Sequence, residues 1–191
     1  MKKLKLIVLL ICFTASSFAS EDKLFGGGMF IETGYWKVST LYGDASGSPL
    51  GIGGKLHFQL SKHYRIGMMG AKTTLNYINI GLEGSYLQLG YGGLTGEAVY
   101  EKGDVIITGG FLFGGASINN LHLLNKTVPE SVYSAQINHY TSLIFSPIVS
   151  VEYAATEKIS LTLICDYLMG DKIAEDTKLG PKFRFGVIFA S

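Results

Sequence analysis

Residues 142–169 alternate between apolar and polar side chains with a period of two. Val149 and Val151 fall on one parity, whereas Ser150 falls on the other. After a polar interruption at residues 154–157, the alternation resumes. A period of two is the spacing of side chains on one face of a β-strand, so the pattern predicts two strands joined by a tight turn.

The same alternation extends over most of the chain and predicts an all-β protein. Eight strands are expected, at about residues 25–38, 50–60, 64–77, 84–101, 104–118, 142–153, 159–169 and 181–190. The parity of the apolar residues is expected to slip near Gly70. Gly90, Gly92 and Gly93 predict a β-bulge in the fourth strand. Pro147 predicts another in the sixth, because proline cannot donate to the ladder.

The connections between these strands alternate between short and long. Short turns are expected near residues 61–63, 101–104 and 154–157, and longer connections at 39–50, 78–83, 119–137 and 170–180. In outer-membrane barrels short turns lie at one rim and longer loops at the other. The pattern therefore predicts an eight-stranded antiparallel up-and-down transmembrane β-barrel. The 119–137 segment is the best candidate for contact with a surface ligand.

The first residues have the three-part organisation of a secretory signal peptide. A lysine-rich start precedes the apolar run 6–13, which is shorter than the roughly 20 residues that a spanning helix needs. Ser17 and Ala19 supply the small side chains of a cleavage site. We therefore expect a signal peptide at 1–19, Sec-type export, and one outer-membrane β-barrel domain at 20–191.

Composition narrows the class of protein. Charged residues make up 16% of the chain, against about 25% in ordinary soluble domains, and 25 of the 191 residues are glycine. Beyond the signal segment, no run of apolar residues is long enough for a spanning helix. There is no basic stripe that would bind nucleic acid, and Cys165, alone after cleavage, excludes an internal disulfide. These features favour an exported β-protein in or beside a membrane.

With this strand pattern over residues 25–191, the chain resembles the small eight-stranded outer-membrane barrels of the OmpX, OmpW and OmpA transmembrane-domain types. The resemblance implies residence in the outer membrane of a bacterium and contact with outer-membrane lipid and lipopolysaccharide. It also implies insertion by the barrel-assembly machinery. One feature departs from the family, because the terminal alternating run FRFGVIF ends at Phe189, before the last residue.

If the apolar parity faces lipid, the polar parity fills the lumen. An eight-stranded barrel is just wide enough inside for side chains, and buried charges must be paired. The expected lumen charge network contains four acids, four bases and one histidine: Glu32, Lys55, His57, Arg65, Glu97, Glu152, Asp166, Lys182 and Arg184. Gln88 is expected beside them. The balance of charge predicts a closed, ion-paired lumen.

A soluble lipocalin-like carrier is an alternative, in which the two faces are reversed and the apolar parity lines an internal cavity. The low content of charge, and the many serines and glycines on the polar parity, favour lipid instead. Seven tyrosines are expected to form interfacial girdles in the membrane barrel: Tyr35, Tyr64, Tyr77, Tyr100, Tyr140, Tyr153 and Tyr167.

The segment NHYTS, residues 138–142, is the best candidate for catalysis. One barrel deacylase family uses a His-x-Ser-Asn stretch with a later glutamate. Here His139 is followed by Thr141 and Ser142, and Glu152 lies downstream. His139 and Glu152 have opposite parity, and extended strand between them would span about 43 Å. No catalytic residue is therefore expected.

Two further motifs are weaker. The run GYGGLTG at residues 90–96 departs from nucleotide-binding spacing and predicts a bulge or close packing of strands. His57 and His63 lack companions at metal-ligand spacing, so no metal or cofactor is expected. The predicted function is a non-enzymatic structural or surface-interaction barrel. The pattern also leaves open a lipid A-modifying enzyme and a narrow conduit for small apolar molecules.

Overall fold

The computed structural model describes residues 25–40, 43–79, 82–127, 132–170 and 177–190. The predicted signal peptide at residues 1–19 lies outside the described residues. Every regular element in the described part of the chain is a β-strand. Within these residues, no helix has the length and apolar character needed to cross a membrane.

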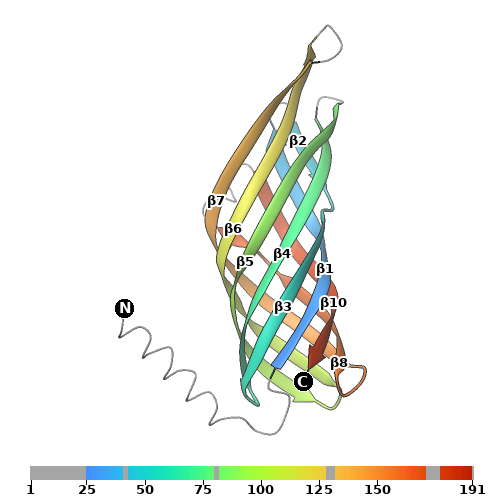
Figure 1. Cartoon of the computed structure of the whole chain (residues 1–191), viewed down its shortest axis with the longest axis vertical. Coiled ribbons are helices and arrows are strands. Elements are labelled where there is room, and N and C mark those ends of the chain that lie inside the picture. Colours follow the sequence, from blue (N-terminus) through green and yellow to red (C-terminus); the bar gives the residue numbers. More distant parts are fainter. Residues whose placement is uncertain (1–24, 41–42, 80–81, 128–131, 171–176, 191) are drawn as a thin grey trace, which may run out of the picture.

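The strands form one antiparallel sheet that closes into a cylinder (Figure 1). They are β1 (Phe25–Thr40), β2 (Gly43–Gly47), β3 (Leu50–Ser61), β4 (Tyr64–Asn79), β5 (Leu82–Lys102), β6 (Val105–Thr127), β7 (Val132–Ala154), β8 (Ile159–Asp166), β9 (Met169–Gly170) and β10 (Thr177–Ala190). The order around the ring is β10-β8-β7-β6-β5-β4-β3-β1, and β10 pairs with β1. β2 and β9 pair with β1 and β7 beyond the ends of β3 and β8. The predicted eight-stranded barrel is confirmed.

The three predicted short turns lie at one end of the cylinder, which we call the short-turn rim. They connect β3 to β4, β5 to β6 and β7 to β8. β1 begins and β10 ends at this rim (Figure 1). Gly103 in the β5–β6 turn has a φ of 61°, a left-handed conformation that glycine adopts without steric cost.

Apolar side chains cover the outside of the cylinder. Val149, Leu161 and Phe183 are 57%, 52% and 42% exposed, whereas Glu152 and Arg184, on the opposite parity, are 2% and 0% exposed. The outward set also includes Met29, Ile31, Leu94, Phe111, Phe113, Phe145 and Phe185. A soluble protein rarely exposes so large an apolar area, so this face is a lipid-facing belt. The reversed, lipocalin-like arrangement is wrong.

Tyrosines lie on the outside near both ends of the belt. Five of those predicted for the girdles are exposed: Tyr35, Tyr64, Tyr100, Tyr153 and Tyr167. Tyr140 is half-buried and packs against the buried side chains of the lumen, so its predicted place in a girdle is wrong. Tyr77 is 7% exposed and points into the barrel, so its predicted place in a girdle is wrong.

Strands β4, β5 and β6 keep one register along their shared length. The β4–β5 ladder is unbroken between Tyr64 and Tyr77, and the β5–β6 ladder has no irregularity. The predicted parity slip near Gly70 and the predicted bulge at residues 90–93 are therefore wrong. The apolar residues that suggested them, such as Leu75 and Leu87, are buried inside the cylinder.

The glycines of GYGGLTG allow close packing of β5 against β6. A Cβ atom on Gly114 would overlap the carbonyl oxygen of Gly92 and would lie 2.5 Å from the Cα of Gly93. A Cβ atom on Gly93 would overlap the carbonyl oxygen of Phe113. The second expectation for this run, close packing, is the one that the structure shows.

Pro147 lies in β7 without a bulge, because β6 pairs regularly with β7 through this position. Its backbone oxygen accepts a hydrogen bond from the N–H of Tyr167 at 3.4 Å. In an antiparallel ladder the N and O of one residue point to the same neighbour, so the missing donor of Pro147 faces Tyr167. There β8 has ended at Asp166 and β9 begins at Met169. The predicted bulge is wrong, and a break in the neighbouring strand accommodates the proline.

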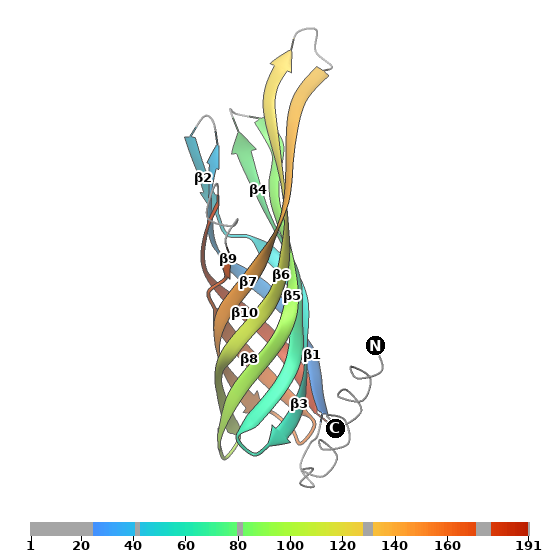
Figure 2. The ribbon, with the colours of Figure 1, turned by 90° about the vertical axis from the view of Figure 1, so that its left-hand side faces the viewer.

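All four predicted long connections contain strand residues. Most of the segment 119–137 belongs to β6 and β7, which form a hairpin that projects beyond the other strands (Figure 2). We call residues 119–127 and 132–139 the extension. The expectation of a long irregular loop is therefore wrong here. Strands that project into water need no apolar face, so their sequence shows no alternation that would have predicted them.

Candidate functional site

The nine side chains predicted for the lumen lie on the inward parity, and none is more than 9% exposed. They form two groups. The seam cluster, where the first and last barrel strands meet, contains Glu32, Asp166, Lys182 and Arg184. The rim cluster, near the short turns, contains Lys55, His57, Arg65, Glu97 and Glu152. Each group contains two acids and two bases.

Arg184 joins two carboxylates in the seam cluster. Its Nε lies 2.7 Å from Oε2 of Glu32, its register partner on β1, and its Nη2 lies 2.9 Å from Oδ2 of Asp166. Lys182 Nζ is 3.7 Å from each of the same two oxygens. Ser146 Oγ donates a hydrogen bond to Asp166 at 2.7 Å. Each buried charge therefore has an opposite charge beside it.

Uncharged side chains of β4 and β5 complete the seam cluster from across the lumen. Thr73 Oγ1 donates to Glu32 at 2.5 Å, and the Tyr91 hydroxyl also donates to Glu32. Arg184 Nη2 donates to the Tyr91 oxygen at 2.6 Å, while Lys182 Nζ lies 3.7 Å from the centre of the Tyr91 ring. Sequence reasoning missed Thr73 and Tyr91. Thr73 has the same inward parity as Arg65 on β4, and this is the signal that could have found it.

The rim cluster links β3, β4, β5 and β7. Lys55 Nζ lies 2.7 Å from a Glu97 oxygen, and Arg65 Nη1 lies 3.0 Å and 3.1 Å from the two oxygens of Glu152. Looser contacts of 3.9 Å join Lys55 to Glu152 and Arg65 to Glu97. His57 Nε2 is 3.4 Å from Arg65 Nη1. The cluster ties opposite walls of the cylinder together.

Away from the short-turn rim the lumen is filled by apolar side chains. Trp36 comes four positions after Glu32 on β1, and Leu75 comes two positions after Thr73 on β4. Trp36 is 0% exposed. We call this filling the apolar plug; it contains Trp36, Val38, Leu75, Leu87, Leu89, Leu112, Ile118, Ile144 and Leu179.

A small polar group lies beside the apolar plug. The Tyr77 hydroxyl is 2.8 Å from Oδ1 of Asn120 and 2.7 Å from Nδ1 of His122. Sequence reasoning missed this group, because Asn120 and His122 were expected in a loop. Gln88, which was expected beside the lumen, lies on the outward parity, where its Nε2 donates to Thr74 at 3.3 Å. The predicted place of Gln88 beside the lumen charges is therefore wrong.

The candidate catalytic residues do not come together. His139 is exposed, and its Nδ1 lies 2.6 Å from Oδ1 of Asn119. Ser142 Oγ donates to the backbone oxygen of Leu143. Glu152 is buried in the rim cluster. Within the described ranges, no three His, Cys, Asp or Glu side chains are grouped so that they could hold a metal ion.

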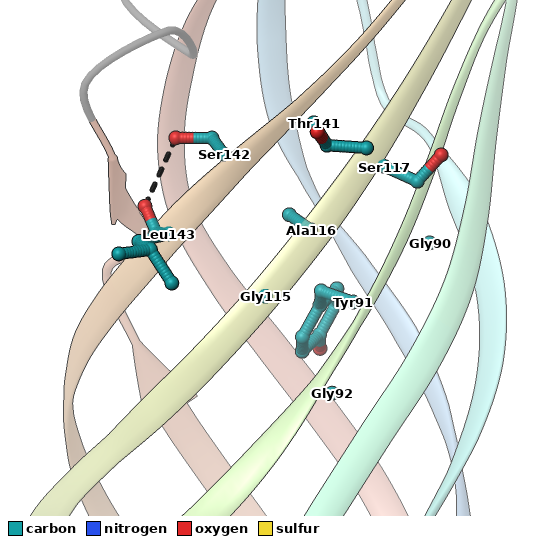
Figure 3. A pocket seen from close by; sticks show the side chains of 9 residues that line it. All are labelled: Gly90, Tyr91, Gly92, Gly115, Ala116, Ser117, Thr141, Ser142 and Leu143. Atoms are coloured by element: carbon teal, nitrogen blue, oxygen red, sulfur yellow. Dashed lines mark hydrogen bonds between the residues drawn. The ribbon is translucent and has the colours of Figure 1, made fainter.

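The outer wall carries an open hollow of about 650 Å³ over β5, β6 and β7 (Figure 3). Its lining consists of Gly90, Tyr91, Gly92, Gly115, Ala116, Ser117, Thr141, Ser142 and Leu143. Most of these residues are on the outward parity, where glycines replace the large apolar side chains found elsewhere on the belt. We call this feature the outer hollow.

No protein-family model and no curated protein sequence matches the chain. Solved structures do match. The outer membrane protein OprG of Pseudomonas aeruginosa has a TM-score of 0.59 at 11% identity, covering 89% of this chain and 96% of that chain. Ail, the attachment invasion locus protein of Yersinia pestis, solved with the heparin analogue sucrose octasulfate, has a TM-score of 0.55 at 12% identity. That match covers 88% of this chain and 99% of Ail.

At these identities, the likeness establishes the fold. The chain has the architecture of the small eight-stranded outer-membrane barrels, and its own apolar belt supplies the surface that such a barrel presents to lipid. Its fold is that of an integral outer-membrane β-barrel.

Proposed function

We propose that this chain is a non-enzymatic outer-membrane barrel with a closed lumen, acting as a compact structural and surface-interaction protein. One observation carries the proposal. Each of the four basic lumen side chains lies within 3.7 Å of at least one carboxylate oxygen: Lys55, Arg65, Lys182 and Arg184. A fully paired lumen offers no free charge to a passing ion.

The apolar plug supports the same proposal and argues against a conduit. A conducting barrel needs a continuous aqueous path, which wider barrels provide. Here Trp36, Leu87 and Ile118 occupy the half of the lumen beyond the ion pairs. A narrow conduit for small apolar molecules would also have to displace these side chains.

The hypothesis of a lipid A-modifying enzyme lacks an assembled site. A hydrolase needs a nucleophile, a base and an orienting acid within hydrogen-bond reach. His139 faces outward, whereas Glu152 is bound by Arg65 in the lumen. Incubation of the purified protein with lipid A, followed by mass spectrometry, tests this part. A product that disappears in His139→Ala would favour the enzyme.

The extension is the part that we propose for contact with a surface partner. Lys126 is the one lysine, arginine, aspartate or glutamate among the residues of the extension. A partner would therefore be contacted mainly through backbone groups and uncharged side chains.

Export and assembly belong to the same proposal. A signal peptide at residues 1–19 would direct the chain to Sec-type export, and the barrel-assembly machinery would insert residues 20–191 among lipid and lipopolysaccharide. Amino-terminal sequencing of the protein from outer membranes should then begin at Ser20. Recovery of the protein from the soluble periplasm would contradict this placement.

Planar-bilayer recording tests the closed lumen. We expect the reconstituted protein to give no stable conductance steps, because the ion pairs and the apolar plug leave no continuous water path. Regular steps that scale with salt concentration would overturn the proposal.

A further inference from the structure

Beyond the lipid-facing belt, the outer wall of β4, β5, β6 and β7 carries a second group of apolar side chains. Ile78 is 62% exposed and Ile137 is 67% exposed. Tyr86, Leu121 and Ile137 are successive register partners across β5, β6 and β7. We call this group the distal patch; it contains Ile78, Tyr86, Leu121, Ala135 and Ile137. Exposed apolar side chains gathered at one place commonly mark a contact surface.

A polar row separates the distal patch from the belt. Thr74, Gln88, Asn119 and His139 are successive register partners across β4, β5, β6 and β7. Gln88 Nε2 donates to Thr74 Oγ1 at 3.3 Å, and His139 Nδ1 lies 2.6 Å from Asn119 Oδ1. Such outward polar groups need water or lipid headgroups around them, because burial in hydrocarbon is costly. The distal patch is therefore not a continuation of the belt.

The distal patch stands beyond the height of the apolar band. Leu121 comes 16 positions after Val105, which begins β6 at the short-turn rim. A strand of that length spans roughly 53 Å, or about 37 Å in height at a tilt of about 45°. The apolar band of such barrels is about 25 Å tall. The patch therefore lies roughly 12 Å outside the hydrocarbon, on the side where the extension projects (Figure 2).

The direction of the distal patch limits what can cover it. Its side chains have the outward parity, so they face along the plane of the membrane and not along the barrel axis. A partner must therefore stand beside the barrel and reach the same height outside the lipid. A second copy of this chain in the same membrane meets both conditions, because it carries the same patch at the same height.

The wall around the distal patch can meet a copy of itself without repulsion. In a two-fold interface the same surface is present on both sides, so like charges would repel. Residues 117–123 and 135–141 contain no lysine, arginine, aspartate or glutamate. A stable interface involves about 20–30 residues on each partner, so the contact must continue past the polar row. The glycines of the outer hollow, on the same strands, leave room there for a second barrel wall.

We propose that the distal patch is the interface through which two copies of this chain form a two-fold dimer in the membrane. Leu121 and Ile137 of one copy pack against the same patch of the other. The proposal rests on the placement of the belt in lipid and goes beyond the proposed function. It is independent of whether the lumen is closed, and it leaves the inward face of the extension available to a surface partner.

Cross-linking of single cysteines with a bismaleimide in liposomes, at a low ratio of protein to lipid, tests the contact. Each variant of the mature chain also carries Cys165→Ser, which removes the native thiol. We expect Ile137→Cys to give a covalent dimer. Ser46→Cys is the matched control and should give none. It is exposed on β2, which pairs with β1, four strands from β6 in the ring of eight.

A charge in the distal patch should break the dimer. Ile137→Asp, added to Leu121→Cys, should reduce the cross-linked fraction at least about tenfold, because two carboxylates would then lie in one interface. Ser46→Asp, added to the same cysteine variant, should leave that fraction unchanged. Ile137 is exposed outside the hydrocarbon, so the barrel can accept the aspartate. Gel mobility with and without heating checks that each variant is folded.

Equal yields of dimer from Ile137→Cys and Ser46→Cys would indicate random collision and would overturn the proposal. A yield that Ile137→Asp leaves unchanged would do the same. Cross-links to a different protein in whole outer membranes, with none between copies in liposomes, would show that another partner covers the patch. Conductance through the lumen would contradict only the closed-lumen proposal. Recovery of the protein outside the membrane would contradict the placement of the belt.

Discussion

Glu32 and Arg184 are 152 positions apart in the chain, yet they are register partners across the seam between β1 and β10, with Arg184 Nε 2.7 Å from Glu32 Oε2. Both side chains are buried. This ion pair can form only when the first and last strands meet, so the electrostatics of the lumen are linked directly to closure of the barrel.

Arg184→Met should therefore destabilise the barrel strongly. The substitution leaves Glu32 and Asp166 to share Lys182, whose nitrogen is 3.7 Å from each. Removal of one partner of a buried ion pair typically costs about 3–5 kcal/mol. Urea unfolding of the lipid-reconstituted protein measures the change. The double variant Glu32→Gln/Arg184→Met removes both charges and should recover part of the loss; a double variant less stable than Arg184→Met would contradict this account.

Lys55 and Glu97 should be energetically coupled. Their closest atoms are 2.7 Å apart and both side chains are buried. We expect a cycle of Lys55→Met, Glu97→Gln and the double variant to give a coupling free energy of about 0.5–3 kcal/mol. Additive losses in unfolding free energy would mean that the pair contributes no stability of its own. Lys55 and Asp166, which belong to different clusters, provide the control pair.

The lipid-facing belt can be tested with a single charge. Val149 is 57% exposed on the outer wall, and an arginine near the middle of the bilayer costs about 2–4 kcal/mol. We expect Val149→Arg to lower stability in liposomes by that amount. Glu157→Arg, in the exposed β7–β8 turn, should have a much smaller effect. Equal effects at the two sites would argue against lipid around the barrel.

Close packing of β5 and β6 predicts different outcomes for two glycines of β6. Gly114→Ala should destabilise the barrel by about 1–3 kcal/mol, because its Cβ would overlap the backbone of Gly92 and Gly93. Gly109→Ala faces open space and should be tolerated. The folded fraction after refolding into detergent, read from gel mobility with and without heating, compares the two variants. Similar yields would contradict the close approach of these strands.

The period-two pattern predicts which residues share a face, but it does not say what that face meets. The outward direction of Val149 could be predicted because its neighbours Ser150 and Glu152 are polar. Leu75 and Leu87 have the same kind of alternation and point inward. Because the lumen was expected to be polar throughout, these inward-facing leucines were assigned to the lipid face. A bulge was then needed to explain the change of parity. The register shows that the backbone continues without one.

Partners within the lumen were harder to predict than the charges themselves. Glu32 on an inward parity must find a cation, so its burial beside a base could be foreseen. Tyr91 could not be assigned, because a barrel tyrosine can serve equally in the lumen or at the lipid boundary. The extension was missed for a different reason. In water both faces of a hairpin can be polar, and no periodic signal remains.

The ion clusters and the apolar plug fill the lumen at different heights along the barrel axis, so each blocks the cylinder independently. Shortening Trp36 or Leu87 leaves the salt bridges in place, and neutralising the charges leaves the hydrocarbon block. To open a pore through this scaffold, side chains must therefore be shortened in the ion clusters and in the apolar plug of the same molecule.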